Sequence, residues 1–262
     1  MTYLSSFLLG LVQGLAEFLP ISSSGHLSIA QNLLGLNTEI PEFFDVLLHL
    51  GTLVAVFVAY WRDICDMVAE LIHGVGDLVH GTTPRQVPPA RRLILLIIVG
   101  TLPLFILLPI HKQVQALSNN MVFIGAALVV TGFLLFACDL VRKGKKTERT
   151  ATIADVLVVG LGQAIATGCV MGFERKFAVR FSFLLSIPAV LGANILSLKD
   201  ALDAGIIWAE VPMYVVGVVT AAVVGYACIR LLRLVAEKGR FGAFAYYCWA
   251  VGLLTLLLNA IK

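Results

Sequence analysis

Long uninterrupted apolar blocks are the feature that most limits what this chain can fold into. Residues 93–110 and 121–138 are each close to the ~20 residues that a helix needs to cross the hydrocarbon layer of a membrane. Charged residues make up 13% of the chain, about half of the ~25% found in soluble domains. A transmembrane β-barrel would show alternating rather than continuous apolar segments. The sequence therefore predicts an all-α polytopic membrane protein that contacts membrane lipids and binds no nucleic acid.

The apolar segments predict helices that together form a single membrane domain over residues 1–262. They cover residues 3–19, 26–36, 43–60, 93–110, 119–140, 153–171, 177–198, 212–230 and 243–260. We interpret the stretches between them as loops, including residues 61–92. Because basic loops favour the cytoplasmic side, the basic stretches 141–149 and 230–240 are expected inside. Loops 111–118 and 199–211 hold few basic residues and are expected outside.

Two sequence echoes indicate an internal repeat. They pair residues 10–16 (Gly-Leu-Val-Gln-Gly-Leu-Ala) with residues 160–166 (Gly-Leu-Gly-Gln-Ala-Ile-Ala) and, more loosely, residues 43–48 with 181–186. The loop charges predict that the helical hairpins of the two halves enter the membrane from opposite sides. We therefore predict inverted repeats over residues 1–140 and 150–262. The basic loop 141–149 would join them. Inverted repeats place a binding site near the bilayer midplane, where broken helices meet.

The two predicted re-entrant hairpins differ in length. The stretch from Gln13 to Phe43 is longer than the corresponding stretch from Gln163 to Phe181, so the second hairpin is shorter by a dozen residues. The missing stretch corresponds to the polar turn of the first hairpin. The second turn is therefore predicted at residues 167–169.

Glu17 is an acidic residue at membrane depth. A carboxylate there is energetically unfavourable, marks a functional site by default and needs a partner. The candidates are a divalent cation, His26 or an arginine from the second repeat, and the alternative is a protonated Glu17 hydrogen-bonded within the bundle. Gln13 lies one turn earlier on the same helix face, and Gln163 is expected to line the same cavity from the opposite side.

A polar turn follows at residues 20–26. Helix N-terminal N–H groups beside the hydroxyls of Ser22, Ser23 and Ser24 and next to Gly25 would suit a phosphate or diphosphate. The simpler interpretation is that Ser22 or Ser23 only caps the following helix. His26 titrates near neutrality and can act as a nucleophile or general base.

Two further pairs of charged or titratable residues are weaker candidates. Asp45 and His49 are spaced four residues apart, so both can face one cavity, although a solvated pair at the membrane surface is an alternative. Arg175 and Arg180 flank the shortened turn, and we interpret them as anchors at the cytoplasmic side.

Three segments closely resemble the bacterial undecaprenyl-diphosphate phosphatase family of the bacitracin-resistance type. They are residues 13–26, 44–53 and 180–188, and the similarity extends over nearly the whole chain. The resemblance implies hydrolysis of a polyprenyl diphosphate, undecaprenyl diphosphate, at the outer (periplasmic) face of the bacterial plasma membrane, for recycling of the cell-wall lipid carrier. It also implies a divalent cation, Mg²⁺ or Ca²⁺, and an inverted-repeat fold with two re-entrant hairpins.

The resemblance also suggests roles for individual residues. Glu17 belongs to the family's Glu-rich motif, which binds the metal ion, and Gln13 stands where some members have a second Glu. Ser22 or Ser23 and His26 match the proposed catalytic Ser and His. The family's second signature, Pro-Gly-x-Ser-Arg-Ser-Gly, has no counterpart here, so its phosphate-binding arginine is missing.

Several alternatives stay open at this point. A catalytically weakened relative would bind the lipid only, and a carrier would move a lipid phosphate between leaflets, since inverted repeats are common in transporters. Whether Ser, His or water attacks phosphorus is also open, as is a homodimer with a second copy of the chain.

Overall fold

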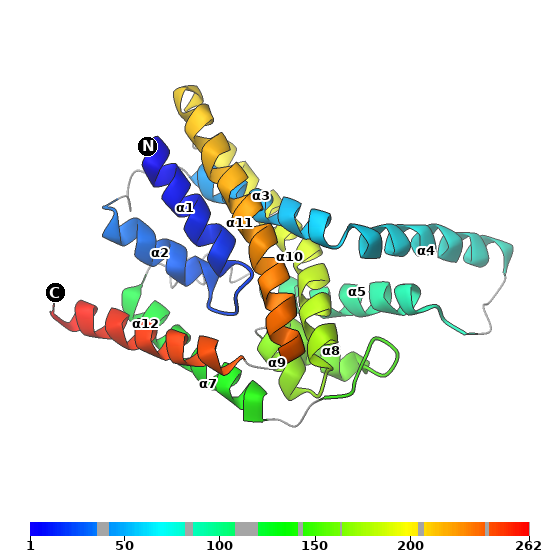
Figure 1. Cartoon of the computed structure of the whole chain (residues 1–262). Coiled ribbons are helices and arrows are strands. Elements are labelled where there is room, and N and C mark those ends of the chain that lie inside the picture. Colours follow the sequence, from blue (N-terminus) through cyan, green and yellow to red (C-terminus); the bar gives the residue numbers. More distant parts are fainter. Residues whose placement is uncertain are drawn as a thin grey trace.

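The computed structural model describes residues 1–35, 42–81, 86–107, 120–140, 144–162, 164–203, 207–238 and 241–261. The elements in these ranges are α1 (Tyr3–Ala16), α2 (Ser23–Leu33), α3 (Glu42–Ala59), α4 (Trp61–His80), α5 (Pro89–Leu107), α7 (Met121–Leu140), α8 (Ile153–Leu161), α9 (Ala164–Val170), α10 (Arg175–Asp203), η2 (Trp208–Glu210), α11 (Val211–Lys238) and α12 (Gly242–Ile261). Figure 1 shows their arrangement. The predicted all-α class is confirmed.

Four of the described helices, α7, α10, α11 and α12, are long and apolar enough to cross a membrane. The helices α3 and α4 would together form a fifth span, which is bent by 80° between Ala59 and Trp61. The apolar helix α1 is shorter. These lengths and compositions confirm an integral membrane protein.

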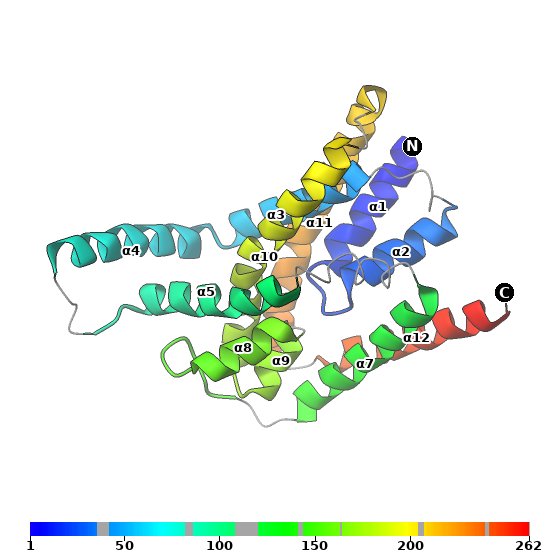
Figure 2. The same cartoon turned by 180° about the vertical axis from the view of Figure 1, so that it is seen from behind.

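Helix α4 occupies much of the stretch 61–92 that we predicted as a loop, so that prediction was wrong. Its exposed apolar side chains follow the helical period, at Trp61, Val68, Leu71, Ile72, Val75 and Val79. Two of its acidic side chains contact α5, where Arg91 binds Glu70 at 2.7 Å and Asp77 at 2.6 Å. Figures 1 and 2 show α4 and α5 projecting together from one side of the molecule.

The two helical hairpins are α1–α2 and α8–α9. The first breaks over residues 17–22, close to the predicted turn. The second breaks after Leu161 rather than at residues 167–169, which belong to α9, so the predicted position of that turn was wrong. The predicted loop 230–240 was also wrong in part, because α11 continues through Lys238. Gln163 lies outside the described residues.

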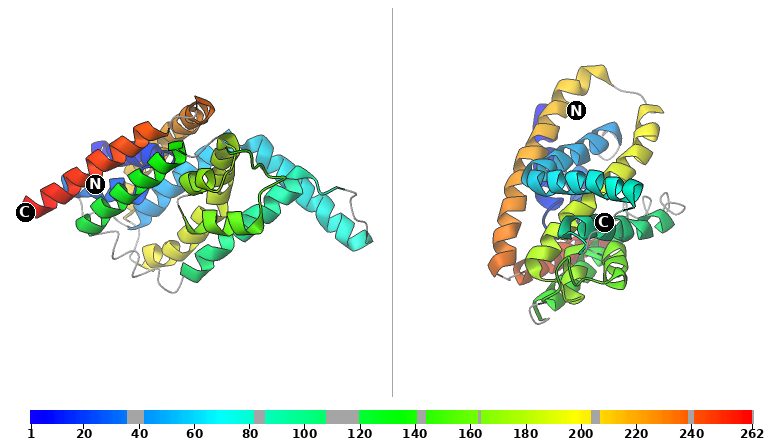
Figure 3. Two further views of the ribbon diagram at one scale, coloured as in Figure 1. Left: turned by 90° about the horizontal axis from the view of Figure 1, so that it is seen from below. Right: turned by 90° about the vertical axis from the view of Figure 1, so that its right-hand side faces the viewer.

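The helices pack in pairs. Helix α1 lies against α11, α8 against α5, α3 against both α10 and α11, and α7 against α12. Figure 3 shows α7 and α12 side by side along their lengths. The contact of α1 with α11 has a counterpart in the contact of α8 with α5. Division of the chain into repeats at residues 1–140 and 150–262 stays a prediction.

Two glycines from the echoed segments make these close contacts. A Cβ atom at Gly10 would clash with the backbone of Gly217 on α11, and one at Gly160 would clash with the backbone of Gly100 on α5. Each pair of helices therefore meets backbone to backbone, which small residues permit in membrane proteins.

Replacing either Gly10 or Gly160 by Ala is expected to destabilise the protein by about 1–3 kcal/mol, because the helices would have to separate. Gly192→Ala is the matched control, since Gly192 is also helical but has no atom within 4 Å of a Cβ. The measurement is unfolding of purified protein in mixed detergent micelles. Equal stability of Gly10→Ala and Gly192→Ala would show that the close approach is not needed.

The entrance to the second hairpin is fixed by Asp155 in the first turn of α8. The Lys146 Nζ atom lies 2.8 Å from both Asp155 carboxylate oxygens, and Lys146 forms a backbone bridge with Phe173. Burial alone would raise the pKa of the Asp155 carboxyl, but Lys146 and hydrogen bonds from Thr152 hold that pKa below its ordinary value. The ion pair thus ties α8 to the chain that precedes α10.

Candidate functional site

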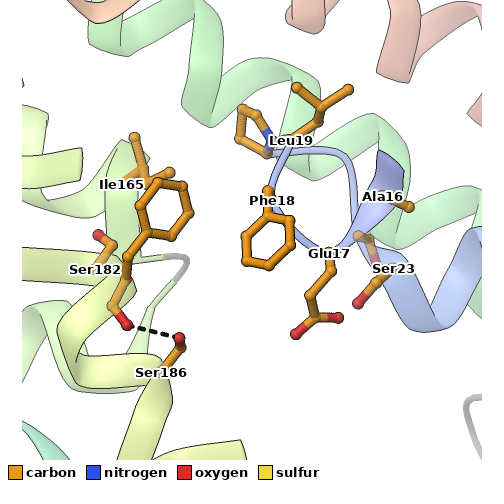
Figure 4. Close-up of a pocket in the computed structure, with 11 residues that line it drawn as sticks. Ala16, Glu17, Phe18, Leu19, Ser23, Ile165, Ser182 and Ser186 are labelled. Carbon is orange, nitrogen blue, oxygen red and sulfur yellow. Dashed lines mark hydrogen bonds between the residues drawn. The ribbon is translucent and has the colours of Figure 1, made fainter. Parts of the chain in front are cut away.

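A pocket of about 230 Å³ lies between the first hairpin and α10. Its lining residues are Ala16, Glu17, Phe18, Leu19, Pro20, Ser22, Ser23, Ile165, Ser182, Phe183 and Ser186. Figure 4 shows Glu17 and Ser23 together on one wall, with Ser182 and Ser186 on the wall formed by α10. The break between α1 and α2 therefore places three of the predicted site residues, Glu17, Ser22 and Ser23, at one opening.

Glu17 has protein partners that the sequence analysis did not assign to it. Gln13 Nε2 donates to Glu17 Oε2 at 3.0 Å and also lies 2.9 Å from His49 Nδ1. His49 Nδ1 is itself 3.5 Å from Glu17 Oε2. The charged partner of Glu17 within the protein is therefore His49 of α3. Among the described residues, Glu17 forms no ion pair with His26 or with an arginine.

The side-chain oxygen of Gln13 is buried and has no hydrogen-bond partner among the described residues. The Gln13 residue as a whole is completely buried. Buried polar atoms are nearly always satisfied, so such an atom needs an explanation. Mg²⁺ and Ca²⁺ prefer oxygen ligands. The unpaired Gln13 oxygen belongs to an amide whose nitrogen contacts Glu17, so it is compatible with a divalent cation bound by that carboxylate.

The protein supplies few ligands of its own. Across the described residues, no group of three or more His, Cys, Asp or Glu side chains is arranged to hold a metal ion. Mg²⁺ is often bound by one or two carboxylates together with substrate phosphates and water. A single carboxylate at this position is therefore compatible with a cation that arrives with a phosphorylated substrate.

The serine turn is strained at its first residue. Ser22 has φ 69°, which is uncommon for a residue other than Gly and often occurs at functional sites. Its side chain makes no capping hydrogen bond, so the capping interpretation was wrong for Ser22. Ser23 is the first residue of α2, and its hydroxyl interacts with Glu17.

The remaining turn residues do not line the pocket. Ser24 is exposed, and Gly25 is buried, where a Cβ atom would lie 3.1 Å from Ile124. The structure therefore brings Ser22 and Ser23, but not Ser24, to the pocket. The close packing of Gly25 favours a structural role for it in the turn.

His26 is turned toward α12. Its Nδ1 atom lies 2.9 Å from the Ser22 carbonyl oxygen, and its Nε2 atom lies 3.0 Å from the Tyr247 hydroxyl. The two rings stack with their centroids 5.6 Å apart. For His26 to accept a proton in the pocket, its bond to Tyr247 must open. Tyr247 was not predicted from the sequence, since nothing marks it among the aromatic residues of an apolar helix.

Asp45 and His49 do not act as a pair at the pocket. Asp45 accepts a hydrogen bond from Gln31 Nε2 at 3.2 Å, whereas His49 contacts Gln13 and Glu17. Neither Asp45 nor His49 is a lining residue of the pocket. Of this pair, His49 contacts the Gln13 and Glu17 side chains next to the pocket.

Two serines of α10 were missed as site residues. The Ser182 hydroxyl donates to the Ala178 carbonyl oxygen at 2.7 Å, and the Ser186 hydroxyl donates to the Phe183 carbonyl oxygen at 2.8 Å. Both serines line the pocket, and a hydroxyl that donates one hydrogen bond can still accept others. Their spacing of four residues in an apolar helix was the available signal.

The predicted arginine anchors lie away from this pocket. Arg175 Nη1 is 3.2 Å from Asp139, and Arg180 Nη2 is 2.5 Å from Asp63. None of the eleven lining residues is Lys or Arg. The described pocket thus lacks the cation that the missing second signature would supply.

Comparison with known proteins gives a consistent result. The chain matches the family of bacitracin resistance protein BacA over residues 6–254. It is 36% identical to an undecaprenyl-diphosphatase of Methanosphaera stadtmanae over 98% of both chains and 38% identical to that of Alkaliphilus metalliredigens over 100% of both. A relative of the same name from Desulforapulum autotrophicum is 40% identical over 97% of both. The chain therefore belongs to the bacitracin resistance protein BacA family.

Proposed function

We propose that this chain hydrolyses undecaprenyl diphosphate to undecaprenyl phosphate and inorganic phosphate. The relatives named undecaprenyl-diphosphatase cover the full length of the chain. The observation that carries the proposal is the partly buried Gln13–Glu17–His49 cluster beside the strained serine turn. The activity would serve recycling of the cell-wall lipid carrier and so contribute to bacitracin resistance.

The first turn of α2 is the proposed binding point for the terminal phosphate. Free N–H groups and the helix dipole favour an anion there, and Ser22 leaves them without a side-chain cap. The hydroxyls of Ser22 and Ser23 lie at the same opening. Phe18 and Ile165 supply apolar walls on which the prenyl chain can rest.

Glu17 and the Gln13 oxygen are the residues that would hold a divalent cation, Mg²⁺ or Ca²⁺. When bound, such an ion neutralises charge on the diphosphate and polarises the phosphoryl oxygens. The protein's own contribution is to hold the Glu17 carboxylate in place through Gln13 and His49. This arrangement orients one acidic group next to the phosphate.

Hydrolysis replaces the bridging P–O bond by a bond from the attacking oxygen to the terminal phosphorus. The Ser23 hydroxyl and a water molecule are the two candidates for that oxygen. His26, once released from Tyr247, is placed on the same turn to hold the proton of the attacking group. Undecaprenyl phosphate then leaves with the electron pair of the broken bond. If water attacks, inorganic phosphate forms in the same step. If Ser23 attacks, a water molecule must next cleave the phosphoserine to release inorganic phosphate and restore the hydroxyl.

We place the reaction at the outer face of the bacterial plasma membrane. The basic loop 141–149 and the basic end of α11 support a cytoplasmic position for those segments. The first hairpin would then enter from the opposite side. In reconstituted vesicles, we expect the protein to hydrolyse undecaprenyl diphosphate only in the leaflet that corresponds to the outer face.

The proposal is tested by incubating purified protein with undecaprenyl diphosphate and separating the lipid products by thin-layer chromatography. We expect undecaprenyl phosphate and inorganic phosphate in equal amounts. Chelation of divalent cations should lower the rate at least about tenfold, with recovery on addition of Mg²⁺ or Ca²⁺. Leaflet exchange of the lipid without hydrolysis, in folded protein, would instead identify a carrier.

A further inference from the structure

A second cleft lies on the same face of α10 as the candidate active site, about one helical turn away. It has a volume of about 290 Å³ and is lined by Tyr60, Asp63, Lys176, Val179, Arg180, Arg233, Ala236 and Glu237. The aromatic ring of Phe183 separates the two openings, since it packs on Phe18 at 5.5 Å and on Tyr60 at 5.7 Å. We call this opening the basic cleft.

The basic cleft contains more cations than carboxylates. Among the residues that line the cleft, three are basic and two, Asp63 and Glu237, are acidic. Lys176 and Glu237 are 3.1 Å apart, but their side chains are 63% and 52% exposed, and an exposed pair of this kind contributes little. Lys176 is therefore able to turn to another anion.

The two arginines have hydrogen-bonding capacity left over. Arg233 lies 4.0 Å over the Tyr60 ring and donates through Nη2 to the Ala59 carbonyl oxygen at 3.0 Å. Arg180 binds Asp63 through Nη2, while its Nε atom is buried and has no partner within the described residues. A guanidinium offers five N–H donors, and a buried donor without an acceptor indicates that something is missing.

We infer that the basic cleft binds the phosphate group of a phosphate monoester or inorganic phosphate. The planar forks of Arg180 and Arg233 match phosphate oxygens, and Lys176 adds a third positive charge. The apolar walls Val179 and Ala236 also allow a lipid chain next to the phosphate. The bound phosphate would compete with Asp63 for Arg180. Its binding does not depend on the residues of the candidate active site.

The chain offers a local probe for this inference. Cys65 is exposed, two residues after Asp63, whereas the other four cysteines are buried. A trifluoromethyl thiol reagent on Cys65 therefore reports the cleft by fluorine NMR. Titration with inorganic phosphate and, separately, with farnesyl monophosphate should shift the signal in a saturable manner.

Substitutions in the basic cleft are expected to change its affinity for phosphate in opposite directions. Arg180→Gln and Arg233→Gln should each raise the half-saturating concentration at least about tenfold, whereas Asp63→Asn should lower it because a competing carboxylate is removed. Arg180→Lys keeps the charge and the pairing with Asp63 but loses Nε, so it tests the donor in a folded protein. Arg62→Gln removes an exposed charge outside the cleft and should change binding less than about twofold.

The two probes distinguish the source of the phosphate. Farnesyl monophosphate binding at least about tenfold tighter than inorganic phosphate would identify a lipid head group, and equal binding would identify free phosphate. No saturable shift with either probe, or equal weakening by Arg62→Gln and Arg180→Gln, would overturn the inference. Glu17→Gln should leave these titrations unchanged, so the inference and the proposed hydrolysis can fail separately.

Discussion

Replacing Glu17 by Gln is expected to lower the rate of undecaprenyl diphosphate hydrolysis by about 10²–10³-fold. The amide has the same shape as the carboxylate, so packing beside Gln13 and His49 is largely retained. The lost feature is the negative charge at the one acidic residue of the pocket. The measurement is the initial rate of phosphate release at saturating divalent cation, with folding checked by circular dichroism.

Glu70→Gln is the matched control for that change. Glu70 is also partly buried and paired, but its partner is Arg91, at the contact of α4 with α5. We expect its rate to stay within about twofold of the unmodified protein. A Glu17→Gln protein that retains more than half of the rate would remove Glu17 from the reaction.

Restoring the arginine of the second hairpin is expected to raise the hydrolysis rate by about 10²-fold. The change inserts a segment containing Pro-Gly-x-Ser-Arg-Ser-Gly between Ala166 and Thr167, inside the short helix α9. The segment has the length by which the second hairpin is shorter than the first. Ile165 lines the pocket and Ala166 is buried next to it, so the new segment begins at the pocket wall. Its guanidinium would supply the cation that the lining residues lack.

The control for this insertion carries Gln in place of its arginine and is otherwise identical. It tests whether a longer second hairpin alone changes the rate. An equal rate for the two insertions would show that the arginine is not what the pocket lacks. A rise confined to the arginine-containing insertion is the expected result.

The helices themselves followed from the apolar blocks, because helix formation in a membrane is dictated by backbone hydrogen bonding and length. The amphipathic helix α4 was not predicted because its many charged residues are typical of a loop between membrane helices. The spacing of its apolar residues Trp61, Val68, Ile72 and Val75 nevertheless indicates a helix. The break of the second hairpin was misplaced because its short turn has no polar motif.

The candidate site was predicted in part. Glu17, Ser22 and Ser23 were selected from the sequence because polar residues at membrane depth are conspicuous, and the structure brings them to one pocket. Their roles in the reaction stay predictions. The contact of Glu17 with His49 depends on how α3 packs against α1, and a single sequence does not specify such long-range contacts. The same holds for Tyr247, which approaches His26 from α12, near the other end of the chain.

The most direct test of the account is the steady-state release of inorganic phosphate from undecaprenyl diphosphate by the unmodified chain and by Glu17→Gln, measured in parallel. Both proteins are purified in the same detergent with the same divalent cation. The account predicts continuous release by the unmodified chain and at least about a hundredfold less by the variant. Equal release by the two proteins, or none above background from folded unmodified protein, would contradict it.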